Sequence, residues 1–150
     1  MPNHPAVTVR ELHATDRARW DKLWAGYLEF YRHELPQHIT DATWQRLIDP
    51  AQQPYAFVAL DASDRVIGFV HYHFHLSTWS LNGYCYLEDL FVDPTVRGLG
   101  AGRALIQAVY RAADERDVTR VYWHTETDNA RAQALYNQIA TLAPYVQYRR

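Results

Sequence analysis

The stretch best suited to chemistry is a glycine turn between an apolar segment and an amphipathic one. Three glycines, at positions 98, 100 and 102, are flanked by Arg97 and Arg103. Glycine turns tightly and lets a backbone approach a ligand closely, because it has no Cβ. The first N–H groups of a helix lack partners within it and carry partial positive charge. The turn therefore predicts a phosphate site, to which both arginines add charge-assisted hydrogen bonds.

The glycine spacing argues against two common nucleotide sites. A P-loop requires Gly-x-x-x-x-Gly-Lys-Ser/Thr, and the chain has no such string. The dinucleotide fingerprint is Gly-x-Gly-x-x-Gly and usually follows the first strand of its fold, whereas this turn follows several predicted strands. A nucleotide-binding domain is a distant alternative, and a turn that only reverses the chain is the plain structural one.

The residues around the turn resemble the acyl-CoA-binding motif of the GCN5-related N-acetyltransferases (GNATs). That pattern is Gln/Arg-x-x-Gly-x-Gly/Ala, and residues 97–102 read Arg-Gly-Leu-Gly-Ala-Gly after Leu-Glu-Asp-Leu-Phe-Val. Downstream, residues 127–136 are similar to the family's Asn-x(6)-Tyr segment. The resemblance, over residues 57–148, implies acetyl-CoA as co-substrate. The implied coenzyme-binding residues are Leu90, Phe91, Val92, Arg97, Gly98, Leu99, Gly100, Ala101, Gly102, Arg103, Asn129, Arg131 and Tyr136.

The resemblance also implies how the work of amine acetylation is divided. The backbone at Leu90, Phe91 and Val92 would pair with the pantetheine arm, and one of their N–H groups would polarise the thioester carbonyl. Glu88 is expected to be the general base, as a buried carboxylate with a raised pKa that takes the proton of the amine directly or through water. Tyr136 is expected to be the general acid that protonates the leaving thiolate.

Each of these roles has a plain structural alternative. The three strand residues could only fill the core, and Glu88 could pair with an arginine. Tyr136 lies on an apolar helical face, where a tyrosine ordinarily packs in the core with its hydroxyl bonded at the edge. Asn129, expected to bond the pantetheine arm, could instead cap a helix, while Arg131 is expected to reach the phosphates.

Strand alternation predicts which residues share a face around Glu88. One face would hold Tyr84, Tyr86, Glu88, Leu90 and Val92, and the other Cys85, Leu87, Asp89 and Phe91. Asp89 is then expected to be structural.

The expected acceptor is a primary amine, either a small polyamine-like molecule or a lysine side chain. Tyr27, Glu29, Glu88 and His124 are the candidate contacts, since acidic and aromatic side chains suit a cation. Most of the aromatic stripe around Tyr27 is expected to be core, and Glu29 could be a solvated surface charge. A non-catalytic acyl-CoA-binding sensor of the same fold is the leading alternative.

Histidines at positions 71, 73 and 75 alternate along one predicted strand. Three imidazoles on one face could bind a metal, but ligands along one strand diverge, and a polar face turned to a cleft or a partner is favoured. No metal site is therefore predicted. Cys85 is expected to be a small buried apolar group rather than a nucleophile.

The elements that must position these residues follow from periodicity and turn signals. Strands are predicted over 7–12, 55–60, 65–74, 84–92, 121–125 and 145–148, and helices over 20–32, 43–48, 100–117 and 129–139. Thr40 and Asp41 are the expected cap of the second helix, and 76–83 a longer connection ending in the turn pair Asn82-Gly83. This order predicts an α/β (α+β type) domain over 1–150. Its sheet would be mixed and mostly antiparallel, of six to seven strands with helices on both faces, the layout that the GNAT resemblance implies.

Composition limits the remaining function classes. The chain of 150 residues is 48% hydrophobic and 21% charged, with a formal net charge of −2, so it has no basic footprint for nucleic acid. No apolar run reaches membrane-spanning length, and the first residues, Met-Pro-Asn-His-Pro, have no signal-peptide core, so neither a membrane span nor a signal peptide is expected. A single cysteine cannot form an internal disulfide, which favours a cytoplasmic location. Family members often dimerise, so a homodimer is expected.

Overall fold

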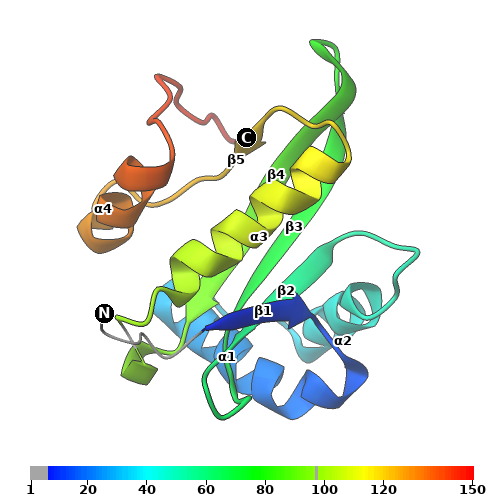
Figure 1. Cartoon of the computed structure of the whole chain (residues 1–150), viewed down its shortest axis with the longest axis vertical. Helices are drawn as coiled ribbons and strands as arrows, with labels where there is room; N and C mark the ends of the chain where they lie inside the picture. Colours follow the sequence, from blue (N-terminus) through cyan, green and yellow to red (C-terminus); the bar gives the residue numbers. More distant parts are fainter. Residues whose placement is uncertain (1–6, 97) are drawn as a thin grey trace.

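The structure is a computed structural model that describes residues 7–96 and 98–150. Arg97, one of the predicted phosphate contacts, lies outside the described residues. Figure 1 shows the arrangement of the elements. They are β1 (Thr8–Glu11), the 3-10 turn η1 (Ala14–Asp16), α1 (Arg17–Phe30), α2 (Gln37–Leu47), β2 (Tyr55–Leu60), β3 (Val66–Ser77), β4 (Ser80–Val92), η2 (Pro94–Val96), α3 (Ala101–Glu115), β5 (Val121–Tyr122) and α4 (Ala130–Ile139).

The strands form one sheet in the order β1-β2-β3-β4-β5. The first four are antiparallel to their neighbours, and β5 runs parallel to β4 over the pairs Cys85–Val121 and Tyr86–Tyr122. This confirms the mixed, mostly antiparallel sheet. In the described chain it has five strands rather than six to seven.

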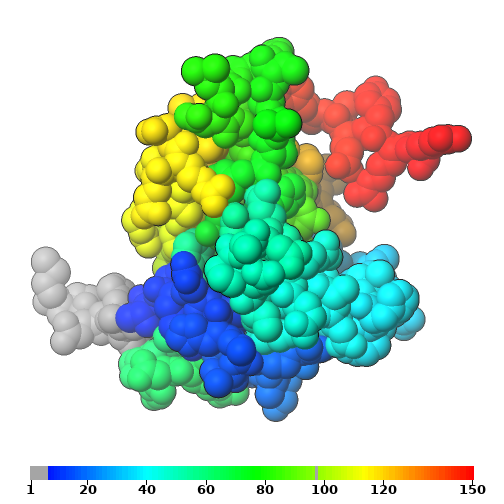
Figure 2. Space-filling model, turned by 90° about the vertical axis from the view of Figure 1, so that its right-hand side faces the viewer, coloured from blue at the N-terminus to red at the C-terminus, as the bar shows by residue number. Residues whose placement is uncertain are grey.

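The expected last strand at 145–148 does not form. Tyr145 and Tyr148 are 77% and 92% exposed, and the tail stands off from the body of the molecule in Figure 2. A strand of four residues is stable only where a neighbouring edge offers it a ladder, and no described edge pairs with this segment. Residues 145–148 do alternate in the sequence, but the strand predicted from this alternation is wrong.

Helices cover both faces of the sheet, as predicted. On one face, α1 and α2 bury Trp20, Trp44 and their neighbours against β2 and β3 residues such as Phe69. On the other face, α3 lies in front of β3 and β4 in Figure 1 and buries Leu105 and Ile106 against the sheet. The two cores share one sheet, so β3 and β4 are held from both sides.

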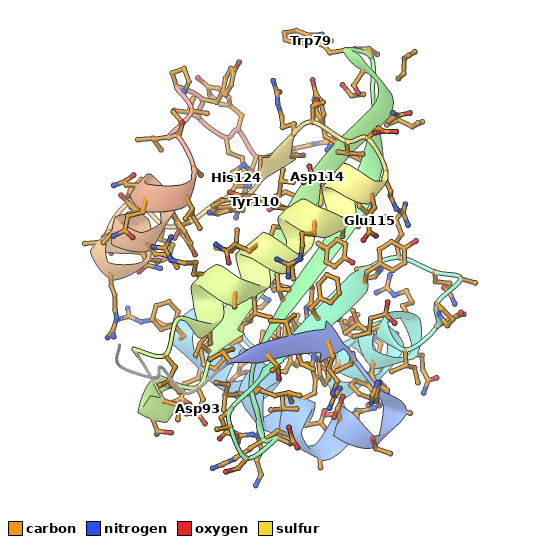
Figure 3. The ribbon with its side chains drawn as sticks, in the orientation of Figure 1. Trp79, Asp93, Tyr110, Asp114, Glu115 and His124 are labelled. Atoms are coloured by element: carbon orange, nitrogen blue, oxygen red, sulfur yellow. The ribbon has the colours of Figure 1, made fainter. Side chains whose placement is uncertain are left out.

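The connection predicted at 76–83 is instead strand, because β3 and β4 continue to a tip of two residues, Thr78 and Trp79. Trp79 stands at the end of this projecting hairpin in Figure 3. Gly83 does have a positive φ of 77°, but it lies inside β4. A Cβ there would meet the His75 carbonyl oxygen at 2.1 Å, so this glycine serves a close backbone approach rather than a turn.

The second helix starts at Gln37, one turn before the predicted cap. Thr40 is buried and accepts a hydrogen bond from Trp24 Nε1 at 3.2 Å, while Asp41 bonds Arg17 at 2.6 Å. Both polar side chains thus join α2 to α1 instead of capping the helix.

Candidate active site

A bulge in β4 at Glu88 decides which side chains share a face. His71 pairs with Asp89, but the next residue of β3, Tyr72, pairs with Leu87, so Glu88 is the extra residue. Alternation restarts after it. Leu87, Leu90 and Val92 therefore belong to the α3-side core, while Phe91 packs in the α1-side core. The predicted single face for Glu88, Leu90 and Val92 is wrong, because no alternation rule can foresee one inserted residue.

The same bulge turns two main-chain positions toward an open edge. The Cys85 N–H donates to Arg120 on the β5 side at 2.9 Å, whereas the Asp93 N–H donates to Ile67 of β3 at 2.8 Å. Backbone groups of consecutive residues face opposite edges, so Cys85 and Asp93 would face the same edge if the strand were regular. The extra residue Glu88 makes them face opposite edges. The backbone groups of Asp93 face β3, so those of Phe91, two residues earlier, also face β3. The backbone groups of Leu90 and Val92 face away from β3.

That outer edge of β4 has no described strand beside it beyond Tyr86, because the pairing with β5 ends there. The N–H and C=O groups of Leu90 and Val92 are thus available to an extended ligand lying along the strand. Phe91 is the third residue predicted to supply main-chain groups, but its N–H and C=O groups face β3 and pair with that strand.

The glycine turn leads from this edge into α3. Gly98 and Gly100 have φ values of 85° and 77°, and a Cβ on either would meet nothing within 4 Å. The conformation, not crowding, therefore requires glycine at both positions. Gly100 caps α3 in the left-handed region, and its carbonyl accepts the Ala104 N–H at 3.0 Å. The earlier N–H groups, at Ala101, Gly102 and Arg103, have no intrahelical partner and lie where the sequence predicts an anion site.

A cavity of about 560 Å³ lies on the α1 side of β3 and β4. Its walls come from α1, α2, β3, β4 and the loop before β2. Of the predicted acceptor contacts, Tyr27 and Glu88 line it. Glu29 is exposed and His124 bonds Tyr86 at 3.1 Å; neither is among the lining residues. Figure 3 shows His124 on the segment that follows β5.

A buried polar network forms the floor of this cavity. Trp20 Nε1 donates to His71 Nε2 at 3.1 Å, and His71 Nδ1 lies 2.9 Å from Asp89 Oδ2. Because an indole N–H can only donate, Nε2 must accept, and Nδ1 carries the hydrogen that bonds Asp89. The Tyr27 hydroxyl donates to Asp89 Oδ1 at 2.6 Å. Burial and the neighbouring Asp89 raise the pKa of Tyr27, so this phenol stays a donor.

Glu88 is more accessible than predicted. Its side chain is 49% exposed, whereas that of Asp89 is 13% exposed. The bulge explains the difference, because it places Glu88 outside the regular ladder. Glu88 Oε2 lies 3.6 Å from His73 Nε2, close enough for an ion pair when the imidazole is protonated. The prediction that the Glu88 carboxylate is buried is therefore wrong, but this carboxyl group does line the cavity.

Tyr136 is half-buried on α4 and contacts Trp123 edge to face at a centroid distance of 5.3 Å. Burial, with a smaller contribution from Tyr31, raises the pKa of Tyr136 to about 12. The pKa of Tyr31 is itself raised by burial and by Glu126 and Asp89. Tyr136 is not among the residues that line the cavity.

The remaining predicted coenzyme contacts lie at the starts of α3 and α4. Asn129 caps α4, with Oδ1 accepting the Ala132 N–H at 3.4 Å, so the structural alternative for this residue does hold. Its Nδ2 donates to Thr125 Oγ1 at 3.3 Å. Arg103 bonds Gln138 across the gap between the two helices. Arg131 is exposed in the first turn of α4.

The three strand histidines have separate partners. His71 is buried in the network, His73 faces Glu88, and His75 bonds the Tyr122 hydroxyl at 2.7 Å. Over residues 7–96 and 98–150, no group of three or more His, Cys, Asp or Glu residues is placed to hold a metal ion. Burial raises the pKa of the Cys85 thiol to about 12, and the residue packs in the core.

Sequence reasoning did not predict most of the cavity lining, including the polar residues His71, Asp89, Thr43 and Arg46. A signal existed for His71, because it interrupts the apolar run of β3 opposite the tryptophan stripe of α1. Asp89 was assigned to the wrong face. Nothing in the sequence marked Thr43 and Arg46, since they enter the cavity only through the packing of α2 beside β2.

Comparisons with known proteins agree with this geometry. The model of the acetyltransferase (GNAT) family matches residues 20–140. The D-amino-acid N-acetyltransferase HPA3 of Saccharomyces cerevisiae is 37% identical over 145 residues, which cover 96% of this chain and 90% of that protein. A thialysine N-epsilon-acetyltransferase of Bos taurus is 34% identical over 74 residues, 49% of this chain and 43% of that one.

Solved structures show the same fold. The aminoglycoside acetyltransferase AAC(6')-Iy, in complex with the bisubstrate analog CoA-S-monomethyl-acetylneamine, superposes with a TM-score of 0.82 at 20% identity, covering 97% of each chain. The ribosomal-protein-alanine N-acetyltransferase of Brucella melitensis gives 0.79 at 23% identity, covering 97% of this chain and 98% of that one. In the part of the chain that the structure describes, no helix is long and apolar enough to cross a membrane.

Proposed function

The chain belongs to the acetyltransferase (GNAT) family and is an acetyl-CoA-dependent N-acetyltransferase; on that premise we propose that it acetylates a primary amine by direct attack, with Glu88 as base and Tyr136 as acid. One observation carries the proposal. The open edge of β4 at Leu90 and Val92 begins directly after the bulge that turns Glu88 into the cavity. Donor and acceptor would therefore meet at one point of one strand.

The residues of the chain fit acetyl-CoA, which supplies the activated acetyl group. The free main-chain groups of Leu90 and Val92 match an amide-bearing arm that lies along β4 as an added strand. The glycine turn and the first N–H groups of α3 suit a diphosphate, and Arg103 lies in the same helical turn. We propose that Arg97, Gly98, Leu99, Gly100, Ala101, Gly102 and Arg103 line this phosphate site. Asn129 and Arg131 at the start of α4 are proposed to lie along the other side of the arm.

The chain would act on the amine through groups already in place. Glu88 lines the cavity and stays open to water, so it can take the ammonium proton directly or through one water molecule. An N–H of Leu90 or Val92 would stabilise negative charge on the thioester oxygen. The raised pKa keeps Tyr136 protonated at neutral pH, so that its phenol can donate to the leaving sulfur.

The acceptor is proposed to be a small amine rather than a lysine of a protein. Relatives named for D-amino acids and thialysine support this choice. The cavity is lined by α1, α2 and the loop at Gln53 and Pro54, and its volume of about 560 Å³ suits a small molecule. Tyr27 would contact the acceptor next to Glu88, while Glu29 and His124, outside the cavity lining, would contact only a longer one.

We further propose that the protein is a cytoplasmic homodimer. Cys85 is buried and free of a disulfide, as expected in a reducing compartment. Leu76, Trp79 and Leu81 at the hairpin tip are 80% to 102% exposed, and the C-terminal tail adds further exposed apolar side chains. Such exposed apolar area favours association. Light scattering on the purified protein measures the mass, and a monomer at micromolar concentration would contradict the dimer.

An acetyl-transfer screen tests the proposed activity. Polyamines, amino acids, aminoglycosides and short peptides are each incubated with the protein and acetyl-CoA, and release of free thiol is followed. We expect release that depends on at least one small amine. If acetyl-CoA raises the melting temperature but no amine is consumed, the protein is an acyl-CoA sensor. If ATP or NAD protects the protein and CoA does not, the nucleotide-binding alternative is correct.

A further inference from the structure

The cavity carries opposite charges at opposite ends. Two carboxyl groups, Glu88 and Asp89, stand at its β4 end. His71 accepts the Trp20 hydrogen bond through Nε2 and faces Asp89 through Nδ1. Arg46 lies on α2, which packs against β2, and β2 is separated from β4 by β3 in the sheet. A ligand that fills this space with a single sign of charge would be repelled at one end.

Arg46 is free to bind a ligand. Among the described residues its guanidinium has no ion pair, whereas Arg10, Arg17 and Arg19 are each bonded to aspartates. Thr43 lies three residues earlier on α2 and lines the same cavity. Residues at this spacing share one face of a helix. The wall therefore presents a planar cationic fork beside a hydroxyl, a combination that suits a carboxylate.

Building on the proposed amine acetylation, we propose that the acceptor is an α-amino acid, whose carboxylate is held by Arg46 and Thr43 while its amino group faces Glu88. A zwitterion matches both ends of the cavity. A polyamine would place a second ammonium against Arg46. The aromatic and aliphatic wall formed by Trp24, Leu28 and Leu35 leaves an apolar space for the amino-acid side chain. Arg46 is thus a specificity residue of the acceptor site.

The test compares amino acids with their carboxamides. Alanine, phenylalanine and both of their carboxamides are assayed in D and L forms by thiol release from acetyl-CoA. For the wild type we expect kcat/KM for the acid to exceed that for the amide by roughly tenfold to a hundredfold, the range expected for a charge-assisted bidentate contact. In Arg46→Gln this ratio should fall to near one, and in Arg46→Lys to an intermediate value, because lysine keeps the charge and loses the fork.

Arg65→Gln is the matched control. Arg65 is exposed in the β2–β3 turn, on no wall of the cavity, and its loss changes the net charge by the same amount. It should keep the acid-to-amide ratio of the wild type. A wild type that prefers the amide, or an Arg46→Gln variant that keeps the ratio, overturns the inference while leaving amine acetylation intact.

A binding measurement separates the two proposals. If no amine is acetylated, the proposed function fails, but alanine and alaninamide can still be titrated by calorimetry in the presence of CoA. Binding of the acid that is lost in Arg46→Gln supports the carboxylate site on its own. Binding that is equal for acid and amide, or absent for both, contradicts it.

Discussion

Replacing Tyr136 with phenylalanine separates catalysis from stability. The ring packs on Trp123, and no described residue accepts a hydrogen bond from the hydroxyl, so Tyr136→Phe keeps the packing. We expect the free energy of unfolding to change by no more than about 0.5 kcal/mol. Turnover should fall roughly a hundredfold or more, the usual contribution of a positioned proton donor, while CoA affinity stays within about twofold of the wild type, since only contacts made during the reaction are lost.

Tyr110→Phe is the matched control. The Tyr110 hydroxyl donates to the Ile139 carbonyl at 3.0 Å and so ties α3 to the end of α4; Figure 3 shows it on α3. Losing this bond should cost about 1 kcal/mol and leave turnover unchanged. We therefore expect Tyr136→Phe to lower turnover without loss of stability, and Tyr110→Phe to lower stability without loss of turnover.

Three assays decide the comparison: thiol release for kcat, calorimetry for CoA binding, and urea unfolding for stability. The pH profile adds a fourth check. A pKa of about 12 keeps the Tyr136 phenol protonated, so its ionisation should not reduce kcat below about pH 11. The same shift favours the folded state below the unfolded value near 10, and this contribution is lost as the pH rises through 12. A Tyr136→Phe enzyme with wild-type kcat refutes the assignment.

Three further variants test other parts of the site. Glu88→Gln should lower kcat about a hundredfold with CoA affinity unchanged; unchanged kcat in steady-state assays would exclude Glu88 as the base. Gly100→Ala should destabilise the protein by about 1–2 kcal/mol, because φ is 77° there, and weaken CoA binding in calorimetry; a neutral effect contradicts the strained cap. Asp93→Asn should lower stability by about 1.5–3 kcal/mol at pH 7, since Asp93 accepts hydrogen bonds from Arg19 and Thr95. Burial alone would raise the pKa of Asp93, but these bonds outweigh it and lower the pKa. Its stabilisation is therefore present above about pH 4 and lost below, and urea unfolding of the variant should lack this acid-side loss.

Asp93 is an example of a local sequence signal that predicted the structure correctly. An Asp-Pro pair predicted the end of the strand, and the chain does leave β4 there. Figure 3 shows Asp93 at this exit. The glycine turn and the helix after it were equally readable, because positive φ values and unpaired helical N–H groups depend on neighbours in sequence.

Features that depend on pairing between distant segments could not be predicted from the sequence. The bulge at Glu88 exists only in the register between β3 and β4, and it reassigns the faces of every residue from Asp89 to Val92. The cavity needs α2 to pack beside β2, so neither Arg46 nor Thr43 carried a signal. The tail at 145–148 has strand-like alternation but no described partner, and alternation alone cannot supply one.

The structure of a crystal soaked with CoA tests the central claim most directly. We predict that the amide groups of the pantetheine arm bond the main chain of Leu90 and Val92, and that the diphosphate lies on the first N–H groups of α3. The sulfur should then lie between Glu88 and Tyr136. A coenzyme that avoids the outer edge of β4, or a sulfur placed away from both side chains, would contradict the account.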